Sequence, residues 1–319
     1  MLPYAVGYNM EMKYKSLKEL ATEWNISERR IRQLIEEGRI EGAVKIGKSW
    51  LAPSDTAKPR DARVSVKSEE FIIELPSTLK DIDKKLALLN IKRPLPTATL
   101  KSLKENELVD WTYNSNGIEG NTLTLKETKV VLEGITIGGK SVVEHLEAIN
   151  HKEAILYLEG LVSKDVDLTE RDIRSIHQLI LKEIDADNAG RYRTENVIIS
   201  GATHIPPDHT IVRDQMEELI INLNRWTKKY HPLVVAALLH GEFVKVHPFV
   251  DGNGRTARLL MNFIAMKFGY PPLVIKKEQR FEYYDALDTA HTTKNYSMFV
   301  NIITIIAGKA LDFYLSIIG

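Results

Sequence analysis

Residues 247–258 constrain the fold and the chemistry of this chain more than any other segment. They read His-Pro-Phe-Val-Asp-Gly-Asn-Gly-Arg-Thr-Ala-Arg. Apolar periodicity predicts one helix that ends near Val246 and a second that begins near Asn253, so a tight loop joins them. Gly252 and Gly254 let an oxygen atom approach the backbone closely, and the first N–H groups of the second helix have no helical partners. The segment therefore predicts an anion-binding cradle.

The side chains around the predicted cradle suit phosphate transfer. Asp251 offers a carboxylate to Mg²⁺, which binds through one or two carboxylates together with phosphate oxygens. Arg255 and Arg258 lie three residues apart in the first turn of the second helix, where they can bind different phosphates through charge-assisted hydrogen bonds. His247 precedes the loop and is placed to take a proton from an incoming hydroxyl. Each feature alone is also common at ordinary helix ends and turns, so the prediction depends on their combination.

The combination matches the H-P-F-x-D-G-N-G-R-x-x-R signature at every specified position, and on these residues the chain resembles the Fic family. Most Fic proteins transfer AMP from ATP to protein side chains. The resemblance implies that His247 is the general base, that Asp251 binds the metal and that Arg258 reaches the γ-phosphate. It implies that the ATP-binding residues of this segment are Asp251, Gly252, Asn253, Gly254, Arg255, Thr256, Ala257 and Arg258.

Two further segments resemble parts of the Fic fold. Residues 190–207 are similar to the flap, a β-hairpin that lies over the nucleotide and aligns the target by strand pairing. The resemblance implies nucleotide contacts from Val197, Ile198, Ile199 and Ser200. Residues 280–287 are similar to the helix that lines the adenine pocket, which implies a contact from Tyr283. His291 departs from the family, since relatives often carry Asn near the adenine, and we expect it to take that place.

Residues 115–120, Ser-Asn-Gly-Ile-Glu-Gly, fit the [ST]-x-x-x-E-[GN] inhibitory motif of Fic proteins. Ser115 and Glu119 are four residues apart and share a helix face. By resemblance, the Glu119 carboxylate pairs bidentately with Arg258 and removes the group that the γ-phosphate needs. Some relatives also use this glutamate to remove AMP, so deadenylylation is a second implied activity. The alternative is a surface acid at a helix end, with Gly120 as the cap.

The first sixty residues predict a small separate domain. Two short helices joined by a polar turn at residues 24–27 form a helix-turn-helix, and residues 44–51 predict a hairpin. This block resembles the winged helix-turn-helix of excisionase and MerR-type regulators. Its cations suit phosphate contacts with DNA; they are Arg29, Arg30, Arg32, Lys45 and Lys48. Several glutamates dilute them, so DNA binding and protein docking both remain open.

The sequence therefore predicts a mainly α protein with a helical Fic-type core and a β-hairpin flap, preceded by the winged helix-turn-helix. Residues 1–60 form the small domain, residues 61–97 a linker and N-terminal extension with a strand-like stretch, and residues 98–319 the Fic-type domain with its inhibitory helix. Helices are expected at 77–90, 98–120, 125–134, 141–162, 169–184, 209–228, 232–246, 253–268 and 278–310.

The composition restricts which classes of protein this chain can belong to. With 43 basic and 43 acidic residues the net charge is zero, so no global field steers the chain to nucleic acid or membrane. The absence of cysteine excludes disulfides and thiolate metal sites. We find no signal segment and no stretch of membrane-spanning length, and the apolar run at 298–307 predicts a buried helix. We expect a cytoplasmic protein.

Two functional hypotheses follow. The first is a protein adenylyltransferase that uses ATP and Mg²⁺, is restrained by Glu119 and modifies the hydroxyl of a target protein or of itself. The second is a DNA-binding transcription regulator whose Fic domain senses nucleotide. His247 favours the enzyme, because binding phosphate does not require a base.

Overall fold

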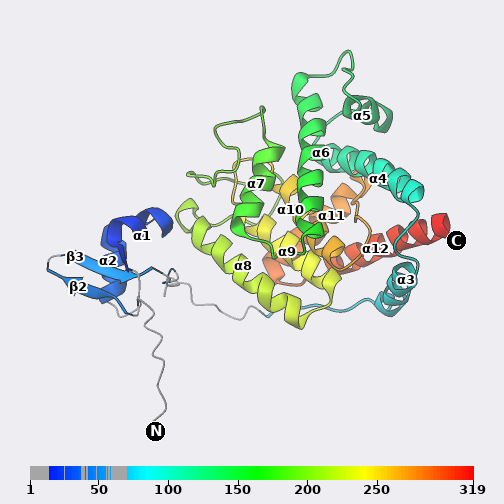
Figure 1. Ribbon diagram of the computed structural model, residues 1–319. Coiled ribbons are helices and arrows are strands. Elements are labelled where there is room, and N and C mark those ends of the chain that lie inside the picture. Colours follow the sequence, from blue (N-terminus) through cyan, green and yellow to red (C-terminus); the bar gives the residue numbers. More distant parts are fainter. Residues whose placement is uncertain are drawn as a thin grey trace, which may run out of the picture. The chain divides into compact units, whose positions relative to one another are not determined.

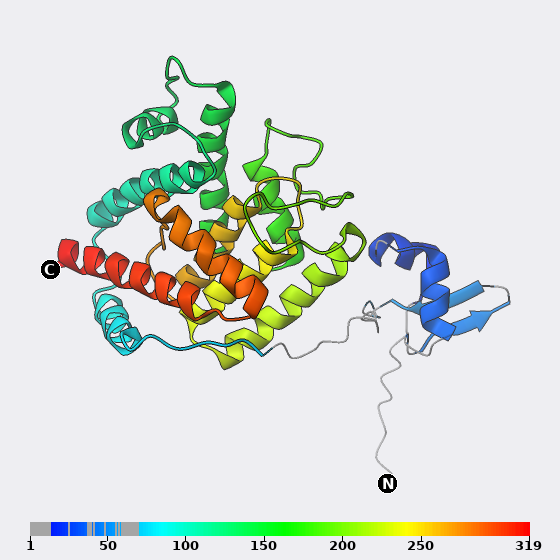
Figure 2. The same cartoon turned by 180° about the vertical axis from the view of Figure 1, so that it is seen from behind.

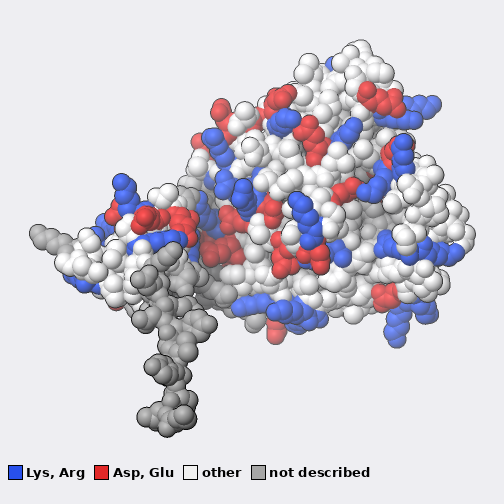
Figure 3. Space-filling view, viewed as in Figure 1, with Lys and Arg blue, Asp and Glu red and all other residues white. Residues whose placement is uncertain are grey.

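The computed structural model describes residues 14–24, 26–36, 40, 42–47, 49–54, 56, 58 and 70–319. The chain divides into two compact units, Met1–Ser65 and Val66–Gly319 (Figure 1). The predicted N-terminal extension falls mostly in the larger unit. On the face that Figure 3 shows, basic and acidic side chains are interspersed over the larger unit, as expected for a chain without net charge.

The smaller unit combines two helices with a three-stranded sheet. Its elements are β1 (Tyr14–Ser16), α1 (Leu17–Trp24), α2 (Glu28–Glu36), β2 (Val44–Ile46) and β3 (Ser49–Pro53). The sheet is antiparallel with the order β1-β3-β2. Leu20, Ile31 and Leu34 are buried between the helices and the sheet. The predicted hairpin is confirmed as β2 and β3, whereas three-residue β1 is too short to show an alternating pattern.

Side-chain caps fix where the two short helices begin. Ser27 Oγ accepts a hydrogen bond from the Arg30 N–H at 3.2 Å, which caps the start of α2. The Ser16 hydroxyl and the Glu19 carboxylate exchange hydrogen bonds with each other's backbone N–H groups at the start of α1. Lys48, for which the sequence predicts a DNA contact, and Asn25, in the predicted turn, lie outside the described residues.

The larger unit is built from helices. They are α3 (Leu79–Ile91), α4 (Thr97–Ile118), α5 (Leu125–Leu132), α6 (Val142–Ser163), α7 (Glu170–Ile180), α8 (Val212–Lys229), α9 (Pro232–Val246), α10 (Asn253–Lys267), α11 (Arg280–Thr293) and α12 (Ser297–Ile318). Capping boxes begin α5, α6 and α7, where Thr124, Ser141 and Thr169 each pair with an acidic residue three positions later.

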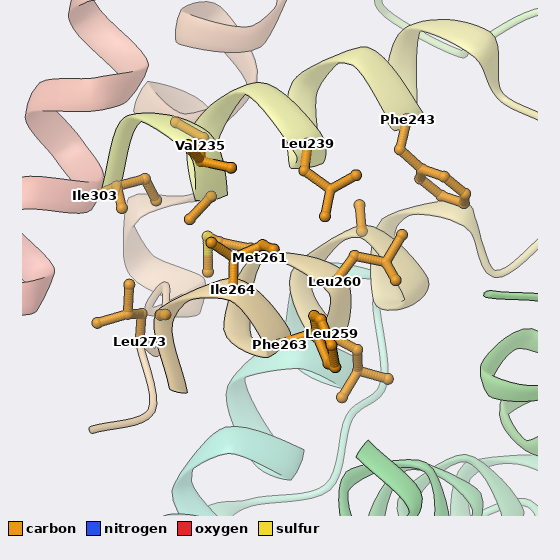
Figure 4. Close-up of a cluster of buried hydrophobic side chains, with 14 of the residues drawn as sticks. Val235, Leu239, Phe243, Leu259, Leu260, Met261, Phe263, Ile264, Leu273 and Ile303 are labelled. Carbon is orange, nitrogen blue, oxygen red and sulfur yellow. The ribbon is translucent and has the colours of Figure 1, made fainter. Parts of the chain in front are cut away.

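The helices α9 and α10 form the centre of this unit, and the others surround them (Figure 1). Val235, Leu239 and Phe243 of α9 lie toward α10, which presents Leu260 and Met261 (Figure 4). Because α9 is buried over most of its surface, apolar side chains lie around most of its circumference. Seen from behind, α11 and α12 cover one side of this pair, and α3 lies beside α12 (Figure 2). The loop that joins α9 to α10 is therefore carried by the most deeply buried helices.

The prediction of one helix over residues 278–310 is wrong, because the chain breaks between α11 and α12. Lys294 adopts a left-handed conformation with φ of 60°. The break is filled by Ile72, whose N–H donates to Lys294 O at 3.0 Å and whose carbonyl accepts from the Tyr296 N–H at 2.9 Å. The apolar pattern continues across the break because both helices bury a face. The strand-like stretch thus packs on the larger unit, with Phe71 edge-on to Trp226.

The prediction of a β-hairpin in residues 190–207 is also wrong, since these described residues form no strand. Its backbone groups bond elsewhere. The Arg193 N–H donates to Pro248 O at 2.9 Å, and the Arg193 side chain donates to Glu195 O and to Pro207 O. The apolar side chain of Ile198 is 84% exposed, so no facing strand covers it. We refer to residues 190–207 as the flap segment.

Helix α12 is long and apolar enough to cross a membrane by length and composition alone, contrary to the expectation from the sequence. In this structure, half of the most apolar 18-residue stretch of α12 is buried inside the larger unit. Phe299, Ile303 and Ala307 belong to the main core. Burial in the core accounts for its composition, as predicted for residues 298–307.

Five buried or half-buried histidines, whose pKa values burial lowers, link stability to pH; they are His151, His177, His240, His247 and His291. Burial lowers the pKa of His151 to about 3, and that of His177, His247 and His291 to about 4. Once unfolded, each takes up a proton near pH 6.5. Below that pH the unfolded state binds more protons, so stability is lost as pH falls toward the folded-state pKa values. Burial raises the pKa of Glu107 to about 7, so in this pH range the folded state binds about one extra proton at Glu107. This proton offsets about one of the protons that the histidines take up on unfolding.

We therefore expect the urea midpoint of unfolding to fall when the pH is lowered from 7 to 5. The His151→Gln variant, in which one of these histidines is replaced, should show a shallower fall. Urea titrations followed by circular dichroism at several pH values measure both. A midpoint that stays constant over this range would mean that the histidines titrate alike in the folded and unfolded states.

Candidate functional site

The loop between α9 and α10 is held in one conformation by its own side chains. His247 and Gly252 both adopt left-handed conformations, with φ of 49° and 75°. Asn253 Oδ1 accepts from the Phe249 N–H at 3.0 Å, and Asn253 Nδ2 donates to Phe249 O at 2.9 Å. The ring of Phe249 is fully buried. A buried aromatic ring and a buried amide thus clamp the loop at its middle.

The predicted anion cradle consists of the N–H groups of residues 252–255. Within the described part of the larger unit, none of these four groups donates a hydrogen bond. The first helical bond runs from the Thr256 N–H to Gly252 O at 3.0 Å. Unbonded N–H groups at a helix start, together with the helix dipole, favour an anion at this point.

Arg258 is the most enclosed cation of the site, with 2% of its side chain exposed. Its Nε donates to Ser115 Oγ at 3.0 Å, and its Nη2 donates to Ser115 O at 2.7 Å and to Glu119 Oε1 at 2.6 Å. The predicted pairing of Glu119 with Arg258 is present, but it uses one nitrogen and one oxygen instead of the expected bidentate geometry. Burial alone would lower the pKa of Arg258, but Glu119 and Tyr283 raise it.

Arg255 is nearly as buried, with 3% of its side chain exposed, but has different partners. Its Nη1 donates to Glu147 Oε1 at 2.9 Å, and its Nη2 donates to Asp251 Oδ2 at 3.0 Å. The second oxygen of Glu147 accepts from Asn121 Nδ2 at 2.8 Å. Glu147 on α6 therefore connects the cation of the cradle to the residues that follow Glu119.

A cavity of about 500 Å³ opens beside the cradle. Eight of the predicted residues line it: Glu119, Ile199, Ser200, His247, Gly254, Arg258, Tyr283 and His291. The other predicted nucleotide-binding residues do not line it; they are Val197, Ile198, Asp251, Gly252, Asn253, Arg255, Thr256 and Ala257. The side chains of Thr256 and Ala257 are fully buried in the helix packing.

His247 lies at this cavity as a neutral, half-buried imidazole. Burial lowers its pKa to about 4, so near pH 7 the ring carries no charge and can accept a proton. Its backbone is held from the flap segment, since Arg193 Nε donates to His247 O at 2.9 Å. The flap segment thereby holds the backbone of His247 even though it forms no hairpin.

Asp251 is the residue best suited to hold a metal ion. Its side chain is 66% exposed at the edge of the cradle. Among the described residues, no group of three His, Asp or Glu side chains is arranged to bind a metal. A single exposed carboxylate next to a phosphate site fits Mg²⁺, which keeps several waters and takes its other ligands from phosphate.

Comparison with known proteins decides the family. The Fic/DOC family model matches residues 167–265. Among solved structures, a fragment of Fic-1 from C. elegans is 33% identical with a TM-score of 0.68, and the alignment covers 75% of this chain and 71% of that chain. The chain belongs to the Fic/DOC family. A Fic domain containing signaling protein from Bacteroides thetaiotaomicron is 30% identical with a TM-score of 0.68, over 76% of this chain and 97% of that chain.

Curated Fic relatives are similar over a longer stretch than the family model. Over 243 residues, or 73% of this chain, it is 35% identical to protein adenylyltransferase Fic of Drosophila willistoni and 37% identical to that of Drosophila melanogaster. These alignments cover 48% of each relative. The chain thus spans about half the length of the curated relatives that it matches.

Three residues of this Fic site were not predicted from the sequence. Glu147 binds Arg255, Arg193 holds His247, and the ring of His177 stacks on Phe249 with centroids 3.6 Å apart. Arg193 lies in the segment that resembles the flap, and that resemblance is a signal that could have identified it. Glu147 resembles any solvated acid on a helix, and nothing in the sequence marks it.

We expect Asn253→Ala to destabilise this Fic domain by about 2–4 kcal/mol, since it leaves a buried N–H and a buried carbonyl of Phe249 without partners. Asn106→Ala is the control, because Asn106 is an exposed helical residue, and its effect should stay within about 0.5 kcal/mol. Urea unfolding of the three proteins measures both values. Equal stability of Asn253→Ala and the wild type would show that the clamp does not hold the loop.

Proposed function

We propose that this Fic protein transfers AMP from ATP to the hydroxyl of a protein Ser, Thr or Tyr residue. The observation that carries the proposal is the placement of neutral His247 on the same cavity as Gly254 of the cradle and Arg258. The names of the curated relatives, which are protein adenylyltransferases, support it. The acceptor protein is unidentified, and the enzyme itself is one candidate.

In the proposed reaction, His247 takes the proton of the acceptor hydroxyl while the hydroxyl oxygen attacks the α-phosphorus. The bond from that phosphorus to the bridging oxygen breaks, and pyrophosphate leaves with the electron pair. The cradle and Arg255 bind the α- and β-phosphates, and Arg258 binds the γ-phosphate. Asp251 would hold Mg²⁺, which when bound neutralises charge on the phosphates.

We propose further that Glu119 restrains this activity. Its carboxylate occupies Arg258 and lies against the cradle, since a Cβ atom on Gly254 would collide with Glu119 Oε1. A γ-phosphate and the Glu119 carboxylate are both anions that need the same guanidinium. Removal of AMP with help from Glu119, the second activity implied by the family, uses the same position and stays a prediction.

For the smaller unit we propose a winged helix-turn-helix that binds DNA. Arg29, Arg32 and Lys45 are exposed on α2 and β2, and Arg30 is half-buried. These cations suit phosphate contacts. The alternative to the enzyme is then a DNA-binding regulator whose Fic domain senses nucleotide. His247 distinguishes these two functions, because binding a nucleotide does not require a general base.

His247→Ala should lower AMP transfer by about 100- to 10,000-fold, because a general base contributes about that much. Binding of ATP should change little, since the imidazole acts on the acceptor hydroxyl. Incorporation of α-labelled ATP and calorimetric ATP titration measure the two quantities. A variant that transfers AMP at the wild-type rate would remove His247 from its proposed role.

Glu119→Gly should raise AMP transfer by about tenfold or more, since it frees a buried cation from its carboxylate partner. Arg258→Ala in the same chain should cancel the gain, so the two substitutions should be strongly non-additive. Incorporation of α-labelled ATP is compared for the wild type, both single variants and the double variant. Equal rates for the wild type and Glu119→Gly contradict the restraint and leave the proposed role of His247 untouched.

If the smaller unit binds DNA, affinity should fall steeply with salt. Replacing Arg29, Arg32 and Lys45 with Ala should reduce the slope of log K against log salt by about 0.9 for each phosphate that the variant no longer neutralises. Lys18→Ala, an exposed cation of α1, is the control. Gel-shift selection that enriches no sequence, with an unchanged salt slope in the triple variant, would favour protein docking.

A further inference from the structure

His177 of α7 connects the flap segment to the catalytic loop. Its side chain is fully buried and lies outside the family signature. The Gly190 N–H donates to His177 Nδ1 at 2.9 Å, and His177 Nε2 lies 2.8 Å from Asp251 O. The ring is stacked on Phe249 with an angle of 4° between the planes.

These contacts determine which ring nitrogen carries the proton. A backbone N–H can only donate, so Nδ1 accepts and is unprotonated. A neutral imidazole then carries its proton on Nε2, which donates it to Asp251 O. The tautomer is fixed by the amide of Gly190, and the hydrogen bond to the loop follows from it.

The carbonyl of Asp251 and the N–H of Gly252 belong to one trans peptide, so they point in opposite directions. Because His177 holds the carbonyl toward the buried side, the Gly252 N–H points away from that side. This N–H is one of the four unbonded donors of the cradle, as described above for the larger unit. The close approach also depends on glycine, since a Cβ on Gly252 would lie 3.2 Å from His177 Nε2.

We infer that His177 is a positioning residue that fixes the Asp251–Gly252 peptide, so that the Gly252 N–H is oriented to bind a phosphate of the nucleotide. The inference rests on the proposed function in that it takes the anion of the cradle to be a nucleotide phosphate. A peptide held in the binding orientation before the ligand arrives costs no reorganisation on binding. Loss of the hydrogen bond therefore weakens contacts to phosphate and leaves contacts to the nucleoside unchanged.

The test compares ADP with adenosine in His177→Phe, which keeps an aromatic ring against Phe249 and loses both hydrogen bonds. ADP lacks the γ-phosphate, so its affinity does not depend on freeing Arg258 from Glu119. Calorimetric titration should give a Kd for ADP that is about tenfold higher than in the wild type, whereas the Kd for adenosine stays within about twofold. His177→Gln, which retains a donor and an acceptor, should recover part of the ADP affinity.

The matched control is His151→Phe, since His151 is also buried and its ring nitrogen lies 3.4 Å from Thr112 Oγ1. This variant should keep the wild-type ratio of the two Kd values. An equal loss for ADP and adenosine in His177→Phe, or no loss for ADP, overturns the inference. The wild type tests the proposed function separately: if it binds ADP no more tightly than adenosine, the cradle does not take phosphate, and both proposals are overturned.

Discussion

The structure of the site depends on two arginine side chains buried in the first two turns of α10. Arg255 and Arg258 are only 3% and 2% exposed. A buried charge is costly unless it is paired and hydrogen-bonded. Helix α4 therefore supplies Ser115 and, at its C-terminal end, Glu119 to one guanidinium, and α6 supplies Glu147 to the other. The packing of α4 and α6 around α10 thus provides each of these two cations with a carboxylate partner.

The same pairing explains how a strongly cationic site stays compatible with a stable fold when no nucleotide is bound. Glu119 and Asp251 pair with the cations that bind phosphate oxygens under the proposed function. Glu147 differs from them because it holds Arg255 from the side of α6. Arg255 thus keeps one carboxylate partner if Asp251 turns to a metal, whereas Glu119 is the carboxylate that pairs with Arg258. Under the proposed restraint, release of Glu119 therefore removes the carboxylate that pairs with Arg258.

The sequence predicted what lies within one continuous segment better than what depends on distant segments. The loop at residues 247–252 and the helix that starts at Asn253 were predicted from one contiguous motif, whereas the pairing of Glu119 with Arg258 was predicted from the resemblance to the Fic family. The flap was predicted as a hairpin because Val197, Ile198 and Ile199 resemble a strand, but no facing strand within residues 191–205 pairs with them.

Contacts between distant segments were missed for a physical reason. The break after Thr293 depends on Ile72, which lies far earlier in the chain and fills the gap with two backbone hydrogen bonds. In the sequence, Glu147 and His177 look like any polar residue of a helix. Only the packing of α6 and α7 brings them into contact with Arg255 and with the loop. A single sequence carries no signal for such long-range pairs.

We infer that Glu119 and the γ-phosphate compete for Arg258. This competition is tested most directly by the affinities of ATP and ADP for the wild type and for Glu119→Gly, measured by calorimetry. We expect the wild type to bind ATP no more tightly than ADP. Glu119→Gly should bind ATP about tenfold more tightly than ADP, since a released charge pair is worth at least about that factor. The same preference for ATP in both proteins would contradict this inference.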